Sequence, residues 1–329
     1  MDKRRYRYDK NELFWAYLMI APTMLGLALF YVWPVLQTFF YTFTKWGAFN
    51  NYQLTGFDNY KHLLTDQNLL KAFRNTFLFI ALSVPISIFL SIVVAVLLNQ
   101  KVRGLSVYRT IYYLPVVTMP AAIAMVWKWL YNADYGLINY LLSLVHIRGP
   151  QWLTDPRIAM YSVIVVAIWS SIGSNMIIFL SGLQGISSTY YEAASIDGAS
   201  PLRKFWMITL PLLTPTVFFV AVVSLIGGFQ VFDLIFMMVV GSSAGTATTP
   251  AIDTTQTVVY LFYRYAFMLN NKGYAATVAM VLFVIILAVT YVQMKLQKNG
   301  FTTNRRLVGW LLALMAPGAG RRHYSFTSF

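Results

Sequence analysis

Six long apolar runs alternate with shorter polar segments along the chain. A helix that spans a membrane needs about 20 apolar residues, and each run is long enough. The pattern therefore predicts an all-α, polytopic membrane protein with six transmembrane helices. The runs cover Leu13–Val35 and on to Phe43, Phe73–Leu98, Ile111–Tyr131, Ile158–Leu183, Leu210–Val240 and Tyr274–Leu296.

The first run follows a short basic segment, which is also how a secretory signal begins. The run continues past Phe30 without a small-residue cleavage site. We therefore expect an uncleaved first span. Prolines such as Pro85, Pro115 and Pro120 interrupt other runs, and neighbouring helices make such breaks tolerable in a membrane.

Composition supports the membrane class. The chain is 58% hydrophobic and 11% charged, whereas soluble domains carry about 25% charged residues. The net charge of +14 could indicate nucleic-acid binding. No basic stripe interleaved with aromatic residues is present, so we favour basic residues gathered at cytoplasmic helix ends and expect no nucleic-acid partner.

The Lys and Arg residues of the connecting segments predict an orientation. If the N-terminus lies inside, sixteen of the 25 Lys and Arg residues fall in inside segments. Cytoplasmic segments carry such an excess, so both termini are expected in the cytoplasm. Three units follow: a basic N-terminus (1–12), a six-helix transmembrane domain (13–298) and a basic tail (299–329).

The tail contains a nine-residue apolar segment, Leu307–Met315, which is too short to span. It is expected to lie flat on the inner surface, where Arg305, Arg306, Arg321 and Arg322 meet anionic lipid. The alternative is an unstructured tail.

The residues that enzymes need are missing from the pattern. His62, His146 and His323 lie in separate segments without metal-ligand spacing. Glu12 and Glu192 are the only glutamates, and no glycine precedes a lysine, so a phosphate-binding P-loop is lacking. We expect a chain that is not an enzyme and binds no metal or cofactor of its own.

Polar residues within the apolar runs are candidates for a solute pathway. Asp233 stands out, because an ionisable group inside a span is a functional candidate by default. Gly227–Gly228 lies near the middle of its run, where an interrupted helix can line a cavity. Helix packing is the competing interpretation for Ser174 and Asn175, and hydration at the outer end for Asp233. The candidate pathway residues are Ser174, Asn175, Ser224, Gly228, Gln230 and Asp233.

The inside segment 185–211 carries the most informative pattern. Hydroxyl residues from Ser187 precede a predicted short helix over Tyr190–Ile196, and Gly198 permits a left-handed turn. A second short helix is predicted from Pro201 to Thr209, with Pro211 at the entry to the fifth span. Such a helical pair with an apolar side suits a groove on another protein; the alternative is a solvated connector.

Glu192-Ala193-Ala194, Gly198 and Ile208-x-Leu210-Pro211 have the spacing of the EAA loop of permease subunits of bacterial ABC importers. Further stretches resemble the carbohydrate-uptake branch, of the maltose and glycerol-phosphate type. They are Gly56–Tyr60, Asn75-Thr76, Tyr108–Pro115, Trp127–Asn132 and Phe229–Asp233. The likeness covers about Leu13 to Lys298 and departs after Val240, at Gly241–Gly245.

This resemblance implies a type I ABC importer permease fold and a coupling helix that docks on a separate ATPase. The implied coupling residues are Glu192, Ala193, Ala194, Asp197, Gly198, Ile208, Leu210 and Pro211. The implied partners are a second, different permease, an ATP-binding subunit dimer that holds ATP and Mg, and an extracytoplasmic solute-binding protein.

The resulting hypothesis is the membrane-spanning permease subunit of an ATP-driven sugar importer in the bacterial cytoplasmic membrane. One alternative is an ion-coupled secondary transporter, in which Asp233 would carry a proton. Another is an ABC permease for a non-sugar solute, because the EAA pattern does not distinguish cargo.

Overall fold

The computed structural model describes residues 10–46, 51–100, 103–240 and 250–314. The N-terminal residues Lys3–Arg7, the segment Gly241–Gly245 and the tail from Met315 lie outside the described residues. The described chain is almost entirely helical, with one short antiparallel hairpin that pairs Thr44 with Leu54.

Five helices in the described chain are long and apolar enough to span a membrane. The first consists of α1 (Lys10–Leu27), the π turn η1 (Ala28–Val32) and α2 (Trp33–Tyr41). The second and fourth predicted spans correspond to α4 (Gln67–Leu98) and α8 (Ala159–Gln184). The third predicted span is not one of these five helices. The fifth combines α10 (Pro201–Lys204), η2 (Phe205–Thr209) and α11 (Leu210–Phe229), and the last is α15 (Lys272–Leu314).

The third predicted span is a bent pair of helices. α5 (Leu105–Val117) and α6 (Pro120–Leu130) meet at 101°. Pro120 biases the preceding residue towards an extended backbone, and Met119 has a ψ of 133°. With this pair counted as one span, the six predicted spans are confirmed.

The prediction for the fifth run was right at its start and wrong at its end. The helix α11 begins at Leu210, as predicted, and the predicted second short helix continues into it without a break. It ends at Phe229, after which the chain turns through Gln230 into the three-residue helix α12 (Asp233–Ile235) and the π turn η3 (Phe236–Val240). Gly227 and Gly228 therefore lie in the last turn of α11 and not at the centre of a span.

The structure also differs from the predicted boundary between the last span and the tail at residue 298. The helix α15 continues past Lys298 as far as Leu314, so residues 307–314 extend a helix and do not form a separate segment. The remaining elements are short and connect the spans. They are β1 (Thr44–Trp46), β2 (Tyr52–Leu54), α3 (Asp58–Thr65), α7 (Leu137–Leu144), α9 (Ser188–Ile196), α13 (Pro250–Thr255), α14 (Val258–Tyr263) and η4 (Arg264–Met268).

The core lies where α4 packs against α8, with α11 beside both. Small side chains let these helices approach closely. Ser83, Ser87 and Ser91 of α4 are buried, and a Cβ on Gly228 of α11 would lie 2.9 Å from Ile80 of α4. The first span, by contrast, has no buried residue in its apolar window and contacts α15 through α2.

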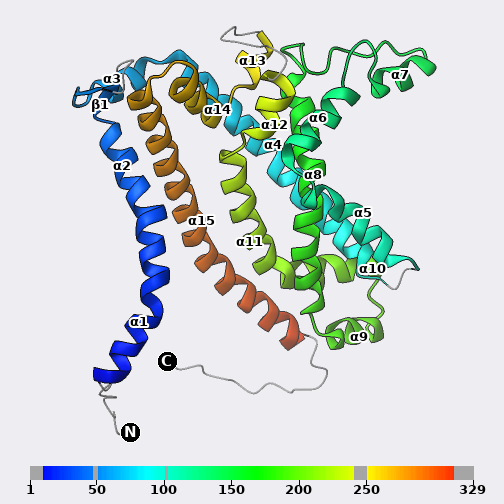
Figure 1. The fold of residues 1–329 in the computed structure, drawn as a ribbon. Coiled ribbons are helices and arrows are strands. Elements are labelled where there is room, and N and C mark those ends of the chain that lie inside the picture. The colour runs from blue at the N-terminus through cyan, green and yellow to red at the C-terminus, as the bar shows by residue number, and fades with distance from the viewer. Residues whose placement is uncertain (1–9, 47–50, 101–102, 241–249, 315–329) are drawn as a thin grey trace.

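The end of the bundle that carries α3, α13 and α14 is tied together by buried hydrogen bonds (Figure 1). Asn75 of α4 donates to the carbonyl oxygens of Asp253 and Gln256, at 3.1 and 3.0 Å. The hydroxyl of Thr76 accepts the N–H of Val258 at 3.1 Å. These bonds fix α13 and α14 against α4.

A second group of bonds at this end, which we call the Asp66 clamp, consists of Asp66, Tyr265 and Tyr274. The Asp66 carboxylate accepts both tyrosine hydroxyls, at 2.9 Å from Tyr265 and 2.8 Å from Tyr274. Its other oxygen accepts the N–H of Asn68 at 2.8 Å and so caps α4. The clamp therefore joins the starts of α4 and α15 to η4.

Burial alone would raise the pKa of Asp66. The hydrogen bonds from Tyr274, Tyr265 and the amides of Asn68 and Leu69 outweigh it, so the pKa of this carboxyl lies below its ordinary value. Burial, together with the bond to Asp66, raises the pKa of Tyr265 to about 12. The clamp therefore favours a charged Asp66 and a neutral Tyr265.

Candidate functional site

The predicted inside segment forms a hairpin at the end of the bundle opposite α3, α13 and α14, and the start of α1 lies at the same end but on the other side of the bundle (Figure 1). We call residues 187–209 the α9–α10 hairpin. Ser187 caps α9 through the N–H of Thr189, at 3.4 Å, and Ser200 caps α10 through the N–H of Arg203, at 3.4 Å. Pro201 occupies the first turn of α10, as predicted, since its fixed φ suits a helix start.

The turn between the two helices depends on Gly198. Its φ is +70°, a left-handed conformation that side chains resist. The N–H of Ala199 donates to Ala194 at 2.9 Å and that of Gly198 to Ser195 at 3.1 Å. This pair of bonds is the Schellman ending of a helix, so the predicted role of Gly198 as a turn residue is confirmed.

The hairpin is anchored in the bundle on one side. Ala194 is buried, and Phe205 and Ile186 pack against a cluster that includes Leu98 and Leu183. Because α10, η2 and α11 form one uninterrupted helix, the second arm of the hairpin is continuous with a spanning helix.

The other side of the hairpin is exposed. Ile196 is 87% exposed, and Leu202 and Trp206 are also largely exposed. Glu192, Ala193 and Asp197 lie on the surface too, and no hydrogen bond or ion pair of the Glu192 side chain occurs within the described chain. Exposed apolar side chains rimmed by polar residues mark a surface that contacts another protein or the membrane.

Pro211 accounts for the π turn that precedes it. A proline inside a helix crowds the carbonyl four residues earlier, here that of Met207, and η2 (Phe205–Thr209) is centred on Met207. In the first span, η1 is likewise centred on Phe30, four residues before Pro34. Ile208 and Leu210, the other predicted motif residues here, are partly buried.

The predicted pathway residues are not gathered in one place. Ser174 and Asn175 lie on α8, and the Ser174 hydroxyl donates to the Ser171 carbonyl of its own helix at 3.0 Å. Asn175 is 7% exposed, and its Nδ2 is buried without a hydrogen-bond partner in the described structure. Ser224 is partly buried on α11.

Gly228 lies in the last turn of α11, and Gln230 and Asp233 follow the end of that helix. Asp233 begins the short helix α12 and is exposed in the isolated chain. The expectation of an ionisable group inside a spanning helix is therefore wrong for Asp233, because α11 ends at Phe229.

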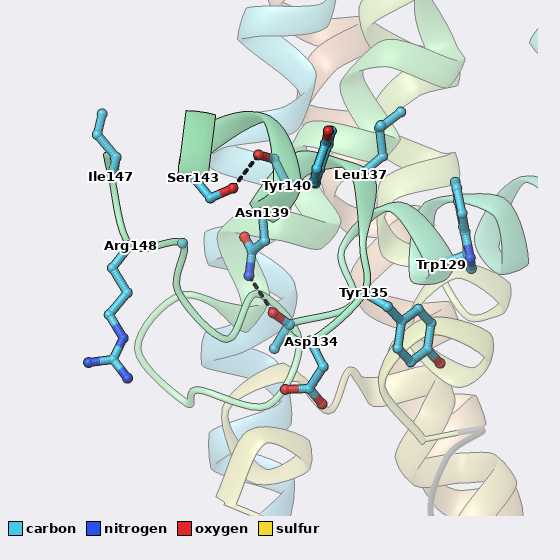
Figure 2. Close-up of a pocket in the computed structure, with 11 residues that line it drawn as sticks. Trp129, Asp134, Tyr135, Leu137, Asn139, Tyr140, Ser143, Ile147 and Arg148 are labelled. Carbon is cyan, nitrogen blue, oxygen red and sulfur yellow. Dashed lines mark hydrogen bonds between the residues drawn. The ribbon is translucent and has the colours of Figure 1, made fainter. Parts of the chain in front are cut away.

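An open pocket of about 570 Å³ lies beside α7, at the end opposite α9. Figure 2 shows Trp129, Tyr135 and Tyr140 with Asp134 and Arg148 around it. Asn139 holds the surrounding loop, because its Nδ2 donates to the Ala133 carbonyl at 3.0 Å and its Oδ1 accepts from Trp152 at 2.7 Å. The two ends of the molecule therefore offer different surfaces.

Comparison with solved structures identifies the class of fold. The chain resembles a subunit of a bacterial ABC transporter involved in import of the acidic polysaccharide alginate, with a TM-score of 0.77 and 22% identity. The match covers 87% of this chain and 96% of that one. The fold is that of a type I ABC importer permease, as predicted.

Sequence comparison then identifies the family. Residues 66–298 match the family described as binding-protein-dependent transport system inner membrane component. The probable ABC transporter permease protein YesP of Bacillus subtilis is 35% identical over 295 residues, which cover 89% of this chain and 93% of YesP. The multiple sugar-binding transport system permease protein MsmF of Streptococcus mutans is 33% identical over 286 residues, covering 87% and 95%. The chain belongs to this family of inner membrane transport components and is a multi-pass membrane protein.

Proposed function

We propose that the chain is one of two permease subunits of an ATP-driven importer and forms part of the path for a sugar. The cargo class is supported by the name of MsmF and by the alginate transporter of similar fold. The proposed cargo is a mono- or oligosaccharide, whereas the EAA pattern alone would also fit a non-sugar solute.

The observation that carries the proposal is the exposed α9–α10 hairpin, continuous with a spanning helix. In the proposed importer, α9 docks in a cleft of a separate ATPase subunit, and Glu192 pairs with a basic residue there. An amphipathic helix laid in a groove is a common mode of protein recognition. ATP and Mg are bound by the ATPase dimer, and this chain binds no cofactor.

The proposal places the α9 end of the bundle in the cytoplasm of a bacterial cell, with the protein in the cytoplasmic membrane. The Lys and Arg bias of the sequence supports this orientation. The opposite end, which carries the α7 pocket (Figure 2), then faces the extracytoplasmic solute-binding protein.

The proposed second permease is a different chain, so the pair is a heterodimer. The first span leaves its apolar surface uncovered in the isolated chain, and lipid and the second permease together would cover it. The basic residues of the tail would contact anionic lipid.

Reconstitution in liposomes tests the proposal. The permease pair, the ATPase and the binding protein are combined, and ATP hydrolysis and sugar uptake are measured with and without sugar-loaded binding protein. We expect the loaded binding protein to stimulate both rates, and uptake to persist when ion gradients are dissipated. Uptake that needs an ion gradient and no ATPase would support a secondary transporter and contradict the proposal.

A further inference from the structure

Side-chain hydrogen bonds, as well as the turn at Gly198, hold the two arms of the α9–α10 hairpin together. The backbone connection between α9 and α10 is only Asp197–Ser200, which could act as a hinge. Two side-chain hydrogen bonds cross from α9 to the following helix within the described hairpin. They determine whether α9 moves with the spanning helix or swings independently of it.

One of these bonds is on the surface. Lys204 Nζ donates to Ser195 Oγ at 2.7 Å, and Ser195 Oγ donates to the Tyr191 carbonyl at 2.7 Å. Ser195 is exposed. Water competes with exposed polar contacts, so this bond contributes little rigidity.

The other bond is at the buried side. The hydroxyls of Tyr191 and Thr209 lie 3.0 Å apart, and Thr209 is 6% exposed. The Thr209 hydroxyl also lies 3.5 Å from the Lys204 carbonyl, five residues earlier. Either hydroxyl can be the donor between Tyr191 and Thr209, and the Lys204 carbonyl gives Thr209 a second acceptor when Tyr191 donates. This contact is part-buried, whereas the Lys204 bond is exposed, so leaving it unmade is the more costly of the two.

The Tyr191–Thr209 bond joins α9 to the residue at which the π turn ends. Thr209 is the last residue of η2, and α11 begins at Leu210. A π turn is an irregularity at which helices bend and which is frequent at functional sites. A force on α9 that travelled only through α10 would have to cross this wide turn. The Tyr191–Thr209 bond connects α9 to the far side of the turn directly.

We infer that Tyr191 and Thr209 are positioning residues that transmit movement of α9 past the π turn into the spanning helix α11. Neither residue belongs to the EAA spacing described above. The inference rests on the proposed function, since it assumes that α9 docks on an ATPase. It adds the route by which that docking moves the membrane-spanning part.

The test measures solute taken up per ATP hydrolysed in the reconstituted transporter. The variants are Tyr191→Phe and Thr209→Val, which each remove one hydroxyl at nearly constant shape, and the double variant. Thr209→Ser keeps the hydroxyl. Tyr161→Phe is the matched control, because Tyr161 is an exposed tyrosine of α8 and lies outside the hairpin. Thermal unfolding and co-purification of the ATPase establish that each variant folds and assembles.

We expect each single variant to lower uptake per ATP by about threefold to tenfold, and the double variant to be no worse than the singles. Thr209→Ser and Tyr161→Phe should keep the normal ratio. Normal ratios in both single variants, or single effects that multiply in the double variant, would overturn the inference.

A separate variant distinguishes the inference from the proposal on which it rests. If Gly198→Val uncouples uptake while Tyr191→Phe and Thr209→Val do not, the transmission route is wrong and docking stands. If Gly198→Val also leaves the ratio normal, the proposed docking role of the hairpin fails, and the inference fails with it.

Discussion

The Asp66 clamp and the α9–α10 hairpin stabilise opposite ends of the bundle in different ways. The clamp joins residues about 200 positions apart and completes its hydrogen bonds internally, with Tyr274 buried. The hairpin is closed by bonds between residues less than 20 positions apart and leaves Ile196, Leu202 and Trp206 exposed. One end satisfies its polar groups internally, whereas the other leaves apolar side chains exposed in the isolated chain.

The largest effect is expected at the hairpin turn. Gly198→Val should lower sugar uptake by the reconstituted transporter about tenfold, because a left-handed conformation costs an ordinary residue roughly 1–2 kcal/mol and a β-branched one more. A Cβ at this position would meet nothing within 4 Å, so the effect is conformational. Uptake and ATP hydrolysis are measured together.

Two control variants sharpen this prediction. Gly198→Asn should retain most uptake, since asparagine tolerates the left-handed region. Gly104→Val places the same strain, at a φ of +77°, in a turn outside the hairpin. Equal losses of uptake in Gly104→Val and Gly198→Val would mean that strain alone, and not the hairpin, causes the defect.

The next effect concerns stability at the clamp. Asp66→Ala should lower the free energy of unfolding by about 3 kcal/mol, because it removes a helix cap and leaves the tyrosine hydroxyls without their acceptor. Thermal unfolding of the purified chain in detergent would measure it. Asp58→Ala is the matched control, since Asp58 forms an exposed ion pair with Lys61 and its loss should cost about 0.5 kcal/mol or less. Similar melting temperatures for the two variants would contradict the stabilising role of the clamp.

A smaller effect is expected from pH. The folded pKa of Asp66 is lowered, so its contribution to stability is complete above about pH 4 and is lost as the pH falls through the folded value. The folded pKa of Tyr265 is raised to about 12, so its contribution is complete below about pH 10 and is lost as the pH rises through about 12.

The melting temperature measured from pH 3 to 7 tests the acid side of this dependence. Asp66→Asn keeps a hydrogen-bond acceptor but cannot ionise in this range, so its melting temperature should depend less on pH. If the melting temperature falls equally steeply with decreasing pH in the variant and in the natural chain, groups other than Asp66 cause the acid sensitivity.

The sequence was sufficient to predict the spans and the hairpin turn, because apolar run length and the left-handed preference of glycine are local properties. It did not predict that α10 and η2 continue into α11 without a break, since Pro211 suggests a helix start and the structure accommodates this proline through a π turn. It also placed Asp233 inside a span, because the apolar run continues for eleven residues after the helix ends.

The side-chain contacts could not be predicted from the sequence for a different reason. Asp66, Tyr265 and Tyr274 are brought together only by tertiary packing, and Tyr191 reaches Thr209 only because the hairpin closes across a π turn. The spacing of neither set carries a periodic signal. The coupling roles of Glu192 and its neighbours stay predictions, as do those of the pathway residues.

Docking of the α9–α10 hairpin on an ATPase is the central claim, and site-specific labelling tests it most directly. The chain contains no cysteine, so Ile196→Cys and Leu64→Cys each provide one thiol. The side chains of Ile196 and Leu64 are 87% and 84% exposed and lie at opposite ends of the bundle. A maleimide reagent is applied to the permease pair with and without the ATPase. We predict that the ATPase slows labelling at position 196 at least tenfold and leaves position 64 unchanged; unchanged labelling at both positions would contradict the claim.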